Sequence, residues 1–71
     1  MSDNQQEMIE YTTQDVIKNL VEEKQLSLEK AMDAFYLSDT FTKLSDVDTG
    51  LYLEGSDYIY ELLMREKAGK L

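Results

Sequence analysis

Apolar residues recur every three or four positions in the first third of the chain, which is the spacing of one face of an α-helix. They are Ile9, Val16, Ile17, Leu20 and Val21, with Thr13 in the same stripe. Ser2 and Gln5 stand three residues apart, as in a capping box. The pattern predicts a helix over about residues 3–24. The β-branched pair Thr12 and Thr13 leaves open whether this helix is continuous.

Three further helices are predicted, each introduced by a serine whose hydroxyl can cap the first turn. They cover about residues 28–37, 39–44 and 57–68, after Ser27, Ser38 and Ser56. Their apolar stripes are expected to be buried: Leu28, Ala31, Met32 and Phe35 in the first, Phe41 and Leu44 in the second, and Ile59, Leu62 and Leu63 in the third. Short connections favour antiparallel neighbours. We therefore expect an all-α fold, a small three- to four-helix antiparallel bundle, with Phe35 and Phe41 as core anchors.

From the length and composition of the chain we expect one acidic domain over residues 1–71, and we expect that it is not an enzyme. The chain has 71 residues and contains neither histidine nor cysteine. These are the usual general base, metal ligand and thiolate nucleophile. A chain of this length is also too short to build a deep cleft around a pair of catalytic carboxylates. We expect no catalytic residue and no cofactor.

The formal net charge is −8, which restricts the class of partner. It would repel a nucleic-acid backbone and an anionic membrane surface, and it would attract a basic protein. No apolar run approaches the roughly 20 residues that span a bilayer. The first residues also lack the basic and apolar regions of a secretory signal. We expect a cytoplasmic protein that binds neither nucleic acid nor membranes.

Residues 45–56 are expected to form a loop, and the stretch DVDTGLYLEGSD within residues 46–57 resembles a calcium-binding loop at first sight. A calcium loop of the EF-hand type needs glycine at position 6 and oxygen ligands at positions 1, 3 and 5. Counting from Asp46 puts Leu51 at position 6. Counting from Ser45 places Gly50 correctly but puts Val47 at position 3. Both registers fail, so we expect no metal site, and Gly50 is expected to supply a positive φ in a turn.

The same loop and the helix after it carry tyrosines among carboxylates. A partner-binding surface is expected here, formed by Asp48, Tyr52, Glu54, Asp57, Tyr58 and Tyr60. Tyrosine suits such a surface because it combines apolar area with a hydroxyl. The alternative is that residues 51–53 only plug the end of the bundle. In an extended run, Leu51 and Leu53 would point inward and Tyr52 outward.

The run LEKAMDAFYLSDTFTKLSDVDTGLYLEGSDYIYELL, about half of the chain, resembles a family of small uncharacterised bacterial proteins. The resemblance is carried by Ala31, Phe35, Tyr36, Ser38, Thr40, Phe41 and Leu44, by residues 48–53, and by Ser56, Tyr58, Ile59, Tyr60, Leu62 and Leu63. It implies a gene near ADP-ribosyltransferase-like toxins and an accessory or antitoxin-like role. It implies no reaction and no site residues.

Three hypotheses follow. The first is a protein-interaction module for a basic partner, for example a toxin. The second is a structural domain that forms a homodimer or larger homo-oligomer. The third is a small-ligand or metal-binding domain that uses the acidic loop.

Overall fold

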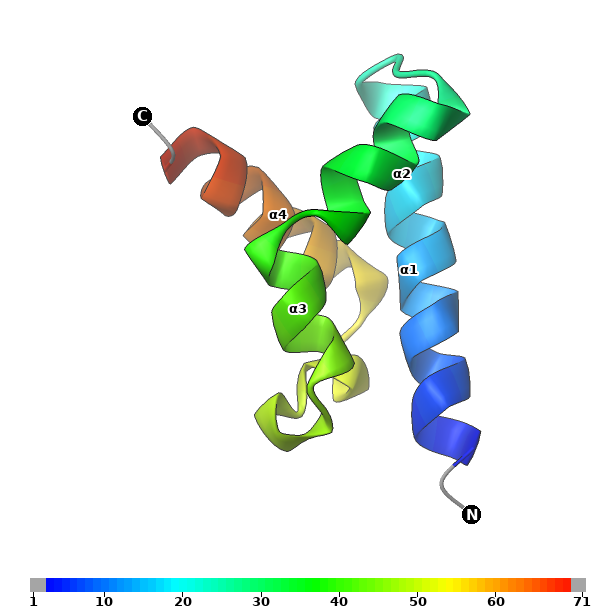
Figure 1. Ribbon diagram of the computed structural model, residues 1–71, viewed down its shortest axis with the longest axis vertical. Helices are drawn as coiled ribbons and strands as arrows, with labels where there is room; N and C mark the ends of the chain where they lie inside the picture. Colours follow the sequence, from blue (N-terminus) through cyan, green and yellow to red (C-terminus); the bar gives the residue numbers. More distant parts are fainter. Residues whose placement is uncertain (1–2, 70–71) are drawn as a thin grey trace.

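The chain folds as a small all-α bundle (Figure 1). The computed structural model describes residues 3–69. Within this range the helices are α1 (Asp3–Glu23), α2 (Leu28–Tyr36), α3 (Asp39–Ser45) and α4 (Ser56–Gly69). The expected loop contains two short 3-10 turns, η1 (Val47–Thr49) and η2 (Leu51–Leu53). The all-α prediction is confirmed, and each helix end lies within a residue or so of its prediction.

The longest element, α1, is the wall against which α2 and α4 pack. It continues without a break through Thr12 and Thr13, and both side chains are buried. It ends before Gln25, whose positive φ of 56° is the left-handed conformation that commonly follows a helix. The chain then turns back along α1 as α2.

The core is assembled from all four helices. Its buried members are Ile9, Val16, Ile17, Leu20, Ala31, Phe35, Leu44, Ile59 and Leu63. Phe35 is fully buried and meets Phe41 edge-to-face at a centroid distance of 5.3 Å. Phe41 itself is only half-buried. The expected burial of Leu28 and Met32 is wrong, because these residues lie beside the core rather than on it and are 62% and 38% exposed.

Two of the three predicted serine caps are confirmed. The Ser27 hydroxyl accepts a hydrogen bond from the Lys30 amide at 3.2 Å, and the Ser38 hydroxyl accepts one from the Phe41 amide at 3.0 Å. Ser56 behaves differently from the prediction: it is the first residue of α4, and its hydroxyl donates to the Asp15 carboxylate at 3.1 Å. It therefore ties the start of α4 to the middle of α1.

The start of α3 is also capped from a distant part of the chain. The Glu66 carboxylate of α4 accepts hydrogen bonds from the Asp39 and Thr40 amides at 2.9 and 2.8 Å, and from the Thr40 hydroxyl at 2.7 Å. A carboxylate at this position satisfies free amide groups and opposes the positive end of the helix dipole. Glu66 thus fixes the angle between α3 and α4.

We expect Glu66→Gln to lower the free energy of unfolding by about 1–2 kcal/mol, because an amide side chain can accept from only one of the two backbone N–H groups. Glu61→Gln is the matched control, since it changes the same residue type in the same helix. Its exposed ion pair with Arg65 contributes less than about 0.5 kcal/mol. Urea unfolding of the two variants compares them directly. Equal stability would show that the Glu66 contacts do not hold α3.

Candidate functional site

A mostly apolar groove lies between α1 and α2. Its volume is about 440 Å³. It is lined by Gln14, Ile17, Lys18, Val21 and Glu22 from α1 and by Leu28, Met32 and Tyr36 from α2. Grooves of this kind accept an amphipathic helix from a partner in many recognition complexes.

The groove is open because of where its apolar residues fall on α2. Ala31 and Phe35 point into the core. Leu28, Met32 and Tyr36 repeat every four residues and are rotated away from that face, so they stand at its side and remain 62%, 38% and 43% exposed. No other described helix covers this stripe. Three large apolar side chains in a row thus face solvent beside Ile17 and Val21.

Acidic residues surround this apolar stripe. Glu29 and Asp33 directly follow Leu28 and Met32 in the sequence, so at 100° per residue they lie along the outer edge of α2. On the α1 side, the groove is lined by Glu22 and by one basic residue, Lys18. The balance is negative, as it is for the whole chain. The electrostatic field at the groove would attract a cationic partner.

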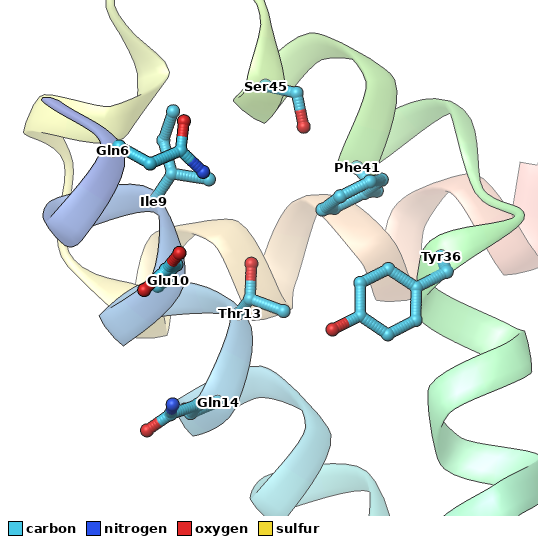
Figure 2. A pocket seen from close by; sticks show the side chains of 8 residues that line it. All are labelled: Gln6, Ile9, Glu10, Thr13, Gln14, Tyr36, Phe41 and Ser45. Carbon is cyan, nitrogen blue, oxygen red and sulfur yellow. The ribbon is translucent and has the colours of Figure 1, made fainter.

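A second, more polar pocket continues the groove toward α3 (Figure 2). Its volume is about 400 Å³, and it shares Gln14 and Tyr36 with the groove. The other lining residues are Gln6, Ile9, Glu10, Thr13, Phe41 and Ser45. Figure 2 shows the α1 side chains on one side of this pocket and the Tyr36 and Phe41 rings on the other. Groove and pocket are therefore neighbours along α1.

The structure does not gather the six predicted partner-binding residues into one patch. Tyr52 packs against the core at the start of α1, where its hydroxyl accepts a hydrogen bond from the Gln5 amide group at 3.1 Å. Tyr60 packs against the core near Glu23, at the opposite end of α1. Eighteen residues of helix, about 27 Å, separate Gln5 from Glu23.

The remaining four members of that set, Asp48, Glu54, Asp57 and Tyr58, are exposed. They lie on η1, after η2 and on the first turn of α4. Partner binding by these residues stays a prediction.

The expected alternation of residues 51–53 is wrong. These residues form the 3-10 turn η2 and not an extended strand, so their side chains do not alternate between two sides. Tyr52 and Leu51 both pack against the core, whereas Leu53 is 66% exposed. Leu51 therefore packs inward as predicted, whereas Tyr52 and Leu53 are opposite to the prediction.

Two polar side chains of the acidic loop bind nearby backbone groups. Asp46 accepts the Asp48 amide at 3.1 Å and caps η1, and the Thr49 hydroxyl donates to the Lys43 carbonyl at 2.7 Å. Gly50 has the predicted positive φ, 71°. Within residues 3–69, no three acidic side chains come close enough together to hold a metal ion.

Comparison with known proteins gives no match to any family model. Searches of curated proteins and of solved structures likewise give no match. Across residues 3–69, none of the helices has the length and apolar character required to cross a membrane.

One signal for the groove was present in the sequence. Leu28, Met32 and Tyr36 repeat every four residues, while Ala31 and Phe35 define a second, adjacent stripe. Together they make the apolar face of a nine-residue helix wider than one neighbour can cover. No pattern in the sequence indicates that the Thr13 hydroxyl lines a pocket, because Phe41 and Ser45 of the distant helix α3 form part of that pocket.

Tyr60 predicts an alkaline limit to stability. Burial, followed by the negative charge of Glu23, raises the pKa of the Tyr60 phenol above its ordinary value of 10.0. The folded state therefore favours the neutral phenol. Its contribution to stability is fully present below pH 10.0 and is lost as the pH rises through the raised native pKa.

We expect Tyr60→Phe to reduce the loss of stability above pH 10.0, because a phenylalanine cannot ionise. Urea unfolding on both sides of that pH measures the effect. Tyr58→Phe is the control, since Tyr58 is 43% exposed. If Tyr60→Phe and wild type lose stability in parallel, Tyr60 is not the group responsible.

Proposed function

We propose that this protein is an interaction module that holds a basic amphipathic helix of a partner protein in the groove between α1 and α2. The observation that carries the proposal is the exposed stripe of Leu28, Met32 and Tyr36, which faces Ile17 and Val21. Contiguous apolar patches of this kind often mark interaction sites on monomeric proteins.

The length of the groove suits a short helix. The nine residues of α2 extend about 14 Å, which corresponds to two to three turns of a partner helix. Such a helix would place apolar residues at positions i, i+3 or i+4, and i+7 into the groove. Burial of these anchors would provide most of the affinity.

The charge supports a basic partner over a second copy of the chain. A twofold contact through the groove would bring Glu22, Glu29 and Asp33 of both copies near one another, and like charges oppose such a contact. A partner with lysine or arginine on its polar face would meet opposite charges instead. The resemblance to the toxin-associated family suggests a basic toxin as that partner.

Selection from a library of random helical peptides tests the proposal without knowledge of the natural partner. We expect enriched peptides to be cationic, to carry the i, i+3 or i+4, i+7 apolar pattern, and to bind more weakly as salt is added. Met32→Glu should weaken their binding by about tenfold or more, because it places a charge in the apolar contact.

Leu53→Glu is the matched control, since it adds the same charge at an exposed leucine outside the groove. Equal effects of the two variants would contradict the proposal, as would acidic peptides among the winners. Sedimentation analysis tests the alternative occupant. A stable dimer that Met32→Glu dissociates would mean that a second copy covers the groove.

A further inference from the structure

The polar pocket at the α3 end of the groove differs from the groove in chemistry. Apart from Ile9 and Phe41, each side chain that lines it carries a hydrogen-bonding group, and Glu10 is the one charged residue among them. A polar pocket next to an apolar groove is suited to bind one polar side chain of a partner, whereas the groove itself offers mainly apolar contacts.

Thr13 provides an independent indication that something polar binds here. Its side chain is only 5% exposed, and its hydroxyl has no hydrogen-bond partner among residues 3–69. Figure 2 shows this hydroxyl directed into the pocket. Buried polar groups in folded proteins are nearly always paired, since leaving one unpaired destabilises the folded state. A bound donor would remove that destabilisation.

The opposite wall of the pocket is aromatic. The Tyr36 and Phe41 rings meet edge-to-face, with centroids 4.9 Å apart and planes at 86°. Two perpendicular rings offer both a face and an edge to an incoming group. A cation over an aromatic face is attracted by the negative potential of the ring, and a planar guanidinium can also stack on it.

We infer that this pocket receives an arginine side chain of the bound helix, an inference that rests on the proposed function. The guanidinium would donate to the Glu10 carboxylate at the exposed side and to the Thr13 hydroxyl at the buried side, with an aromatic ring beside it. Arginine fits better than lysine because its planar group has five donors that can reach several acceptors at once.

The position of this arginine relative to the apolar anchors follows from the shared residues. Gln14 and Tyr36 belong to both the groove and the pocket. Thr13 and Ile17 are one helical turn apart, so the pocket lies about one turn beyond the groove. The arginine should therefore occur about one turn from the last apolar anchor of the partner helix.

The test uses a peptide selected against the full chain and a second peptide in which this arginine is replaced by citrulline, its neutral isostere. We expect the citrulline peptide to bind about tenfold more weakly. Glu10→Gln should weaken the arginine peptide by about tenfold and the citrulline peptide by less than about twofold. Glu7→Gln is the control, because it removes the same charge from α1 three residues away but does not line the pocket.

Thr13→Val removes the hydroxyl with little change in shape. We expect it to weaken the arginine peptide by about threefold to fivefold while leaving the urea midpoint unchanged or slightly higher, since it deletes an unpaired buried group. Equal binding of both peptides, or equal effects of Glu10→Gln and Glu7→Gln, would overturn the inference. The proposed function would then still stand if Met32→Glu abolished binding.

N-acetylarginine amide, titrated alone and followed by amide NMR, separates a side-chain site from a site for a free cation. We expect small shifts at Glu10, Thr13 and Phe41, at an affinity far below that of the peptide. Shifts of this kind without any peptide binding would contradict the groove proposal and make the pocket a small-cation site. No shifts and no preference for arginine over citrulline would contradict the pocket.

Discussion

The corner between α2 and α3 is the constraint on which the arrangement of the other elements depends. Only Leu37 and Ser38 separate the two helices, so the chain must change direction within one turn. Two side chains of α4 hold that corner from outside: Glu66 caps α3, and Lys67 donates to the Ala34 carbonyl at 3.1 Å near the end of α2. These contacts tie α4 to the end of α2 and to the start of α3.

The corner also explains why α1 keeps an uncovered face. Because α2 ends at Tyr36, it is only about 14 Å long, whereas the neighbouring helix α1 is about 31 Å long. Within residues 3–69, no third helix covers the exposed stripe of Leu28, Met32 and Tyr36 on α2, so the groove stays open. Beyond the corner, Phe41 of α3 closes the far side of the polar pocket. The groove and the pocket both result from the change of chain direction between α2 and α3. A bound partner helix would cover the exposed side chains of both.

Local features of this fold could be predicted from the sequence, and long-range ones could not. Ser27 and Ser38 were recognised as caps because a cap depends on the next three residues alone. The cap from Glu66 joins residues 27 apart, and no pattern in the chain signals it. Helical spacing alone predicts that Met32 is buried, whereas its exposure depends on which neighbour faces α2. The groove that we propose as the partner surface depends on the same long-range packing, whereas binding at the acidic loop stays a prediction.

Methionine-methyl NMR tests the central claim most directly, because the side chains of Met8, Met32 and Met64 sample three parts of the surface. Met32 lines the groove, whereas Met8 and Met64 do not. On addition of a basic amphipathic peptide, the account predicts a saturable shift of the Met32 methyl group and intermolecular NOEs from it to the apolar residues of the peptide. Met8 and Met64 should keep their positions. A Met32 signal that stays fixed while the peptide binds, or NOEs to Met8 or Met64 instead, would contradict the account.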